Sequence, residues 1–181
     1  MSSCQIILIP CDHFEEMVIR KITDELKLHF GFPVTVRECH NDITEHYNPS
    51  RRQYDANKLL QMIGAFPGEK AVRIIGLYRV DLYIPVLTYI FGQAILGGEK
   101  AVASLYRLRN ELYGMPKDDA LTVTRFTKVI VHEMGHSFGL VHCQNPECIM
   151  RSSTYVEDID QKKLKFCPTC REELDQLTIK A

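Results

Sequence analysis

Three histidines and a glutamate stand at metal-site spacing late in the chain. Residues 132–142 read H-E-x-x-H-x-x-G-x-x-H. His132 and His136 are four residues apart, so on a helix both side chains project from one face and can hold one ion. Gly139 lets the backbone turn sharply, and this turn would bring His142 back as a third ligand. Because three neutral imidazoles leave zinc an open position for water, the pattern predicts a catalytic zinc site.

The glutamate of this motif predicts the chemistry. Glu133 lies beside the first histidine, where a carboxylate can take a proton from a zinc-activated water and deliver it to a leaving amine. Zinc would lower the pKa of that water toward about 7 and stabilise the oxyanion of a peptide carbonyl. We therefore expect a zinc peptidase with Glu133 as general base and then general acid. The alternative is a zinc-stabilised module that binds peptides or proteins with little or no hydrolysis.

Four cysteines near the C-terminus predict a second metal site. Cys143 and Cys148 form a C-x4-C pair, and Cys167 and Cys170 form a C-x2-C pair. Four thiolates can close a tetrahedral structural zinc site. Two disulfides or four buried thiols are the alternatives, and disulfides are disfavoured in a chain without a secretory leader. We expect two zinc ions per chain, within roughly 15 Å of each other because His142 and Cys143 are consecutive.

The composition limits the class of protein. The chain has 181 residues, a length that fits one domain. Its net charge of −1 gives no electrostatic attraction for nucleic acid or for an anionic membrane. No apolar run is long enough to span a bilayer, and residues 1–10 do not resemble a secretory leader. We therefore expect a cytoplasmic protein with no nucleic-acid or membrane partner. Basic residues near the second cysteine pair are offset by acidic ones and predict a solvated face: Lys162, Lys163, Lys165 and Arg171.

The elements that must position these residues are strands in the first 110 residues and helices around them. Patterning predicts strands over residues 5–9, 34–36, 71–78, 86–91 and 101–108. It predicts helices over residues 14–30, 54–63, 118–138, 157–165 and 171–178, with a loop over 41–53 and Asp12 capping the first helix. The fold class is then α+β, a mixed sheet with packed helices. We expect one catalytic domain over residues 1–181, with an N-terminal lobe of about 1–139 and a C-terminal lobe of about 140–181.

The remaining cysteines and histidines have no partner at ligand spacing. We expect the three cysteines to be small buried hydrophobic residues rather than metal or redox sites: Cys4, Cys11 and Cys39. We expect the four histidines to be surface or hydrogen-bonded residues: His13, His29, His40 and His46.

The motifs together resemble the archaemetzincin family of the metzincin clan of zinc peptidases. The resemblance rests on the histidine motif, on the cysteine pairs with Met150 in C-x4-C-x-M, and on residues 81–94 and 104–108. It implies a zincin fold in which the active-site helix precedes a small zinc-stapled lobe. It also implies that Met150 packs beneath the histidines and that a sheet edge pairs with peptide substrate. Residues 101–107 are our candidate for that edge, with an ordinary interior strand as the alternative.

The resemblance leaves the oxyanion-assisting residue open. Some metzincins use a tyrosine two residues after the Met-turn methionine, but that position is Ser152 here. Tyr155 is a weak candidate, and a plain surface or core tyrosine is the favoured interpretation. The resemblance implies a peptide or protein substrate without naming one.

Overall fold

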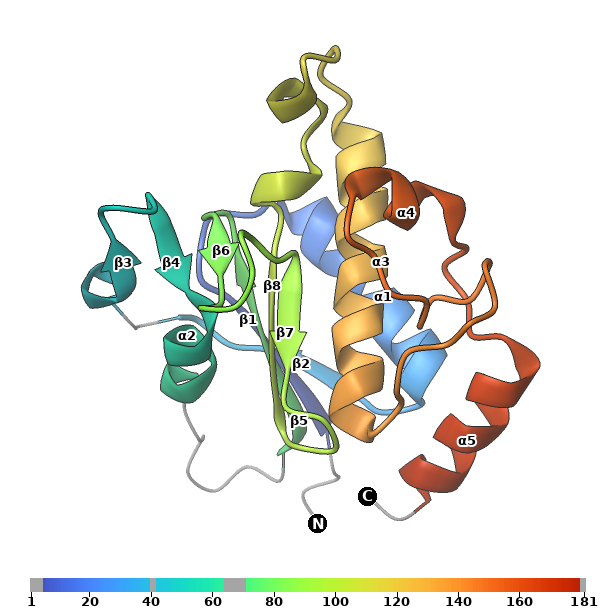
Figure 1. Cartoon of the computed structure of the whole chain (residues 1–181). Coiled ribbons are helices and arrows are strands. Elements are labelled where there is room, and N and C mark those ends of the chain that lie inside the picture. The colour runs from blue at the N-terminus through green and yellow to red at the C-terminus, as the bar shows by residue number, and fades with distance from the viewer. Residues whose placement is uncertain (1–4, 40–41, 64–70, 180–181) are drawn as a thin grey trace.

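A five-stranded mixed sheet forms the centre of the molecule. The computed structural model describes residues 5–39, 42–63 and 71–179 (Figure 1). The strand order is β2-β1-β5-β8-β7, with bounds Val34–Val36, Gln5–Pro10, Ala71–Tyr78, Lys100–Ser104 and Gly92–Ala94 in that order. The first four strands are parallel, and β7 pairs antiparallel with β8 at the edge. A smaller sheet, of order β3-β4-β6, comprises Tyr47–Asn48, Gln53–Asp55 and Leu82–Tyr83.

Helices cover both faces of the main sheet because its strands are apolar on both sides. In β1, Ile6 and Leu8 face one core, which includes residues from α1 (Glu16–Phe30) and α3 (Asp119–Phe138). The alternate residues of β1 face a second core, which includes residues from α2 (Ala56–Met62). Figure 1 shows α1 and α3 side by side, opposite α2. The expected mixed sheet with packed helices is therefore confirmed.

The long helix α3 begins and ends where the sequence predicts. The carboxylate of Asp118 accepts a hydrogen bond from the Leu121 amide at 2.8 Å, which caps the first turn. At the other end Gly139 has φ of 113°, a conformation that L side chains rarely adopt. Its amide donates to the His136 carbonyl at 2.9 Å. The glycine therefore ends the helix and turns the chain back over its last turns.

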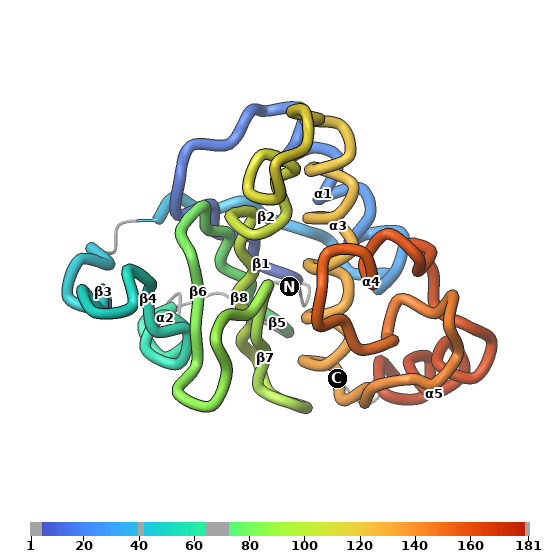
Figure 2. The backbone as a smooth tube through the Cα atoms, turned by 45° about the horizontal axis from the view of Figure 1, so that its top comes forward, coloured from blue at the N-terminus to red at the C-terminus, as the bar shows by residue number. Residues whose placement is uncertain are grey.

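The C-terminal segment is attached to α3 through a buried arginine. This segment contains α4 (Val156–Gln161) and α5 (Pro168–Thr178), and Figure 2 shows both across α3 from the edge strand β7. Arg125 of α3 is 3% exposed and donates two hydrogen bonds, of 2.7 and 2.6 Å, to Asp160 of α4. It also donates to the Leu108 carbonyl at 2.9 Å. Leu108 ends one of the three short 3-10 helices among the described residues, which span Thr44–His46, Tyr106–Leu108 and Asn110–Tyr113.

Some of the predicted elements are wrong. Residues 86–91 form turns and a single bridge rather than a strand, and the edge strand follows at Gly92–Ala94. The strand expected over 101–108 ends at Ser104, and a 3-10 helix begins at Tyr106. The expected loop over 41–53 contains β3, and α2 begins at Ala56 because Asp55 caps it. Asp12 does not cap α1, since its carboxylate accepts from the Arg79 amide at 2.6 Å.

The expectation for two of the three extra cysteines is also wrong. Cys11 and Cys39 form a disulfide that joins the end of β1 to the segment after β2. Nothing in their 28-residue separation signals this pairing, which depends on the parallel alignment of β1 and β2. Cys4 and His40 lie outside the described residues. His29 is buried rather than at the surface, and its Nε2 atom lies 3.3 Å from the Glu25 carboxylate.

Among the described residues, no helix is long and apolar enough to cross a membrane. The expected cytoplasmic location stays a prediction.

Candidate active site

The last turns of α3 and the turn after it bring the three motif histidines together. Their ligand nitrogens lie within 4.8 Å of one another. The Nε2 atoms of His132 and His136 are 3.1 Å apart. Two nitrogens on a tetrahedral zinc, each about 2.05 Å from the ion, would be roughly 3.3 Å apart. His142 packs against both rings, with centroid separations of 5.4 and 4.8 Å. The imidazoles therefore fit a zinc ion.

Backbone carbonyls fix the tautomer of two of these rings. The Nδ1 atom of His132 lies 2.8 Å from the Ile149 carbonyl, and that of His136 lies 2.7 Å from the Leu140 carbonyl. Because a carbonyl only accepts, each Nδ1 carries the proton and each Nε2 is left with a lone pair. Burial lowers the pKa of both imidazoles, which favours the neutral form that a metal requires.

Glu133 is buried beside the histidines under the edge strand. Its side chain is 8% exposed, and burial raises its pKa to about 8, against the opposing effect of the Lys162 ammonium. Gly92 of β7 makes this position possible. A Cβ atom at Gly92 would lie 2.7 Å from Glu133 Cγ and 2.8 Å from the Val102 carbonyl. The edge strand therefore rests directly on the carboxylate because residue 92 has no side chain.

Met150 forms the floor beneath the histidines. Its side chain is fully buried, and a Cβ atom at Gly135 would lie 2.5 Å from its sulfur. Its carbonyl accepts a hydrogen bond from the Cys143 amide at 3.0 Å, which links the floor to the residue after His142. The Met150 side chain therefore packs against α3 at Gly135, and its role as packing rather than as a ligand stays a prediction.

The four cysteines gather in a second cluster. Their sulfurs lie within 4.8 Å of one another, and Cys143 Sγ is 3.7 Å from Cys167 Sγ. Two sulfurs on a tetrahedral zinc, each about 2.3 Å from the ion, would be roughly 3.8 Å apart. Backbone amides of Asn145 and Cys167 donate to the sulfurs of Cys143 and Cys148, at 3.4 and 3.3 Å. The cluster fits a closed metal site.

The histidines face a cavity of about 660 Å³ that lies between the edge strand and the C-terminal segment. Loop 84–91 and β7 form one wall, and residues 152–155 with α4 form the other. No cysteine lines it. The cavity is therefore large enough for several side chains of a peptide and opens on the histidine cluster alone.

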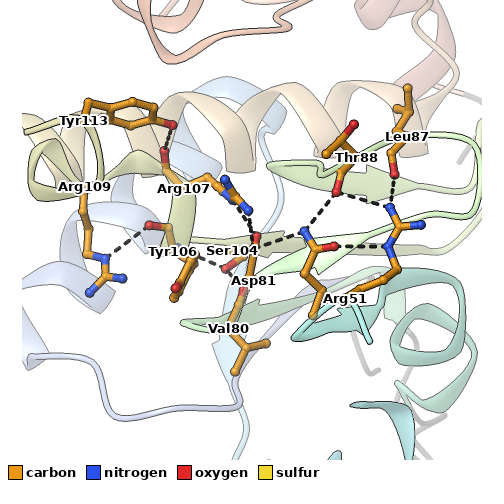
Figure 3. Close-up of polar contacts among 11 residues, drawn as sticks. Arg51, Val80, Asp81, Leu87, Thr88, Ser104, Tyr106, Arg107, Arg109 and Tyr113 are labelled. Carbon is orange, nitrogen blue, oxygen red and sulfur yellow. Dashed lines mark hydrogen bonds and ion pairs between the residues drawn. The ribbon is translucent and has the colours of Figure 1, made fainter. Parts of the chain in front are cut away.

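Polar side chains behind loop 84–91 hold its backbone in place (Figure 3). Arg51 donates to the Leu87 carbonyl at 2.7 Å, and Gln53 donates to the Thr88 carbonyl at 3.0 Å. The buried carboxylate of Asp81 accepts from Gln53 at 3.1 Å and from Arg107 at 2.8 Å. This wall of the cavity is therefore held by a charge-assisted hydrogen bond from Arg51 and a neutral one from Gln53 of β4.

Tyr89 reaches across the cavity from this wall to the other. The Arg107 guanidinium lies 4.6 Å from the centre of its ring and supports it from behind. Its hydroxyl donates to the Thr154 carbonyl at 3.0 Å. The two walls therefore touch at this point through one hydrogen bond.

The structure corrects two expectations about the site. Residues 101–107 are not the sheet edge, because β8 pairs on both sides, with β5 and with β7. The edge strand is β7, and its three residues line the cavity. Lys162 is not part of a solvated face, since it is 3% exposed and lines the cavity. Sequence spacing carried no signal for Lys162, because only tertiary packing brings it near Glu133.

Comparison with known proteins agrees with this geometry. The sequence pattern of peptidase family M54 matches residues 17–176. The archaemetzincin of Thermococcus kodakarensis is 32% identical over 176 residues, covering 93% of this chain and 94% of that protein. The archaemetzincin of Saccharolobus solfataricus is 32% identical over 180 residues, covering 98% and 97%.

Solved structures show the same fold. The crystal structure of archaemetzincin from Methanopyrus kandleri superposes with a TM-score of 0.85 at 32% identity, covering 99% of this chain and 97% of that one. A zinc-dependent peptidase from Methanocorpusculum labreanum gives a TM-score of 0.80 at 30% identity, covering 93% and 99%. The chain therefore belongs to peptidase family M54, the archaemetzincins, and is a zinc metallopeptidase with a zincin-like fold.

Proposed function

We propose that the chain cleaves peptide bonds with one zinc ion held by His132, His136 and His142. Glu133 acts as general base and then as general acid. The observation that carries this proposal is the position of Glu133, buried in the cavity beside three imidazoles whose nitrogens converge. Zinc, when bound, supplies a Lewis acid that polarises a carbonyl and acidifies water.

The residues of the chain supply the proton transfers and the geometry. Glu133 takes a proton from the attacking water, and the C–N bond breaks as the same proton passes to the leaving amine. The edge strand β7 has backbone groups free of sheet partners on its outer side, so an extended substrate can pair with it. Gly92 keeps that strand close enough to Glu133 for the scissile bond to lie over the carboxylate.

We also propose that Cys143, Cys148, Cys167 and Cys170 hold a second, structural zinc ion. The sulfur spacing supports this proposal, as does the absence of these cysteines from the cavity wall. Burial raises the pKa of Cys148 and Cys170, so thiolates at these positions need a cation beside them. With this zinc, residues 1–181 form one catalytic domain, with lobes of about 1–139 and 140–181 on the two sides of the cavity.

The test is cleavage of a diverse peptide mixture by zinc-loaded protein, analysed by mass spectrometry beside Glu133→Ala. We expect products from the unmutated chain and a fall in rate of about 10²–10⁴-fold in the variant, the contribution typical of a general base. Zinc content should stay at two per chain in both, because Glu133 is not a ligand. Equal cleavage by both proteins would refute the role of Glu133. A zinc-replete unmutated chain without cleavage would instead favour the binding module.

A further inference from the structure

Lys162 is a buried cation that faces the reaction site. It directly follows α4, is 3% exposed and lines the cavity together with His132, Glu133 and His142. Its ammonium donates a hydrogen bond to the Arg151 carbonyl at 2.9 Å. Among the described residues of the cavity wall, it is the one lysine or arginine. An ammonium has three N–H donors, so this one has donors left for a ligand in the cavity.

A second buried lysine, Lys128, has its hydrogen-bond donors used within the protein. Lys128 is 8% exposed, and its ammonium donates to the carbonyls of Ile159 and Asp160 at 2.8 and 3.4 Å. It does not line the cavity. Lys162 is even less exposed, but within the described chain it makes one hydrogen bond and no ion pair within 4.0 Å. A buried charge is expensive unless it is paired, so an anion in the cavity would complete this site.

The charge of Lys162 acts on two residues of the reaction site, Glu133 and His142. Burial lowers the pKa of Lys162, and the Glu133 carboxylate opposes that shift. Burial also lowers the pKa of His142, and the Lys162 charge adds to this effect. Lys162 therefore interacts electrostatically with both Glu133 and His142.

The place of Lys162 matches a gap in the site. The position two residues after Met150 is Ser152, so no phenol stands there. Tyr155 is 63% exposed and offers no buried donor. The carbonyl that holds Lys162 belongs to Arg151, between Met150 and Ser152. The ammonium is thus held against the backbone of the residue that precedes Ser152.

We propose that Lys162 is a catalytic residue that donates a hydrogen bond to the oxyanion formed from the scissile carbonyl. This role rests on the proposed function of Glu133. As water attacks, its O–H bond breaks toward Glu133, the new C–O bond forms, and the carbonyl π electrons move to oxygen. When the C–N bond breaks, the oxygen regains its double bond and the amine leaves with the proton. Lys162 keeps all three of its protons throughout.

The test compares Lys162→Met and Lys162→Arg with the matched control Lys128→Met. One fluorogenic peptide, designed on a sequence that the unmutated chain cleaves, gives kcat and KM. A phosphinic peptide of the same sequence, which mimics the tetrahedral adduct, gives a Kd on each zinc-loaded protein. The uncleaved peptide itself gives a Kd in the Glu133→Ala background, with and without Lys162→Met.

We expect Lys162→Met to lower kcat by about 10²–10³-fold, as for loss of an oxyanion donor. The phosphinic peptide should bind more weakly by a similar factor, whereas the plain peptide should keep its Kd within about two-fold. Lys162→Arg should restore part of both losses, and Lys128→Met should change neither. These binding measurements also test for a merely structural role of Lys162. Loss of such a role would change the Kd of the phosphinic peptide and of the plain peptide by the same factor.

Two results would overturn the proposal: an unchanged Kd for the phosphinic peptide, or an equal loss for both peptides, which would mean ground-state binding. If Lys162→Met does not fold, Lys162→Gln provides the same comparison with a neutral polar side chain. Failure of the proposed function would be recognised separately, because Glu133→Ala would then cleave as fast as the unmutated chain.

Discussion

The two metal-binding clusters are joined by one peptide bond, between His142 and Cys143, yet their surroundings differ. The histidines open on a large cavity, with buried Glu133 and Lys162 beside them. The cysteines receive hydrogen bonds from backbone amides, and three of the four are buried. The spacing of both sets fits zinc, so the ligands alone would not decide what a bound ion does. In our proposal the charged groups and the open space next to the ligands decide it.

Among the changes that test this difference between the two clusters, removal of the cysteine cluster should have the largest effect on stability and zinc content. In Cys167→Ser/Cys170→Ser, we expect loss of the structural zinc and of its contribution to folding, which is on the order of 10 kcal/mol. Because Cys143 holds the backbone beside His142, the catalytic zinc should be weakened too. Metal analysis and thermal unfolding would measure both effects.

His136→Ala is the matched control for the cysteine variant. It should reduce zinc from two ions to one per chain and abolish cleavage while the fold remains. A folded cysteine variant that keeps one zinc and full activity would show that the two sites are independent.

Gly92→Ala should have an intermediate effect, restricted to the histidine side. The new methyl group would meet Glu133 and the Val102 carbonyl, so we expect a loss of about 1–3 kcal/mol in the free energy of unfolding. Cleavage should slow, because the carboxylate must move, while zinc content stays the same. Denaturant unfolding and kcat would measure these changes.

A double-mutant cycle sharpens this prediction. In the Glu133→Ala background, Gly92→Ala should cost less stability, because Glu133 Cγ is gone and only the clash with Val102 remains. Equal losses in the two backgrounds would contradict the proposed contact between the edge strand and Glu133.

The smallest effect concerns His29, which packs edge-on against Phe166 beside the cysteine cluster, with ring centroids 5.6 Å apart. Burial lowers its pKa below 6.5, and the Arg171 charge adds to this shift, while Glu25 opposes it. The unfolded chain therefore binds a proton at higher pH than the folded chain does. Stability should fall as pH falls below about 6.5.

Urea unfolding of the unmutated chain and of His29→Gln, at pH values between 5 and 8, would measure this contribution. The unmutated chain should lose more stability toward low pH than the variant, since all other titrating groups are shared. Parallel pH profiles of the two proteins would show that His29 titrates alike in both states.

The parts of the structure that sequence could predict are local. The helix α3, its Asp118 cap, its Gly139 end and the convergence of His132 with His136 follow from spacing along one helix. Such features depend on residues within a few positions of one another. The two cysteine pairs are similar, because each pair is close in sequence: Cys143 and Cys148 lie in the loop after α3, and Cys167 and Cys170 lie at the start of α5.

The parts that sequence could not predict depend on pairing between distant segments. Residues 101–107 are the expected edge because they form the last predicted strand before the active-site helix. The antiparallel pairing with Gly92–Ala94 makes that strand interior instead. The Cys11–Cys39 disulfide depends on parallel neighbours β1 and β2. Lys162 enters the cavity only because α4 packs on α3, held by Arg125 and Asp160.

The hydrogen bond between Tyr89 and Thr154 gives the active site the topology of a ring. The covalent chain runs from Tyr89 through β7, β8 and α3 to Thr154, and this one bond closes the loop. A polypeptide inside such a ring is threaded. It leaves by its ends or when the bond opens. One neutral hydrogen bond contributes about 0.5–1.5 kcal/mol, so this closure is weak. For a substrate that runs through the ring, we expect chain ends to enter while the bond is closed and the middle of a long chain to enter only when it opens.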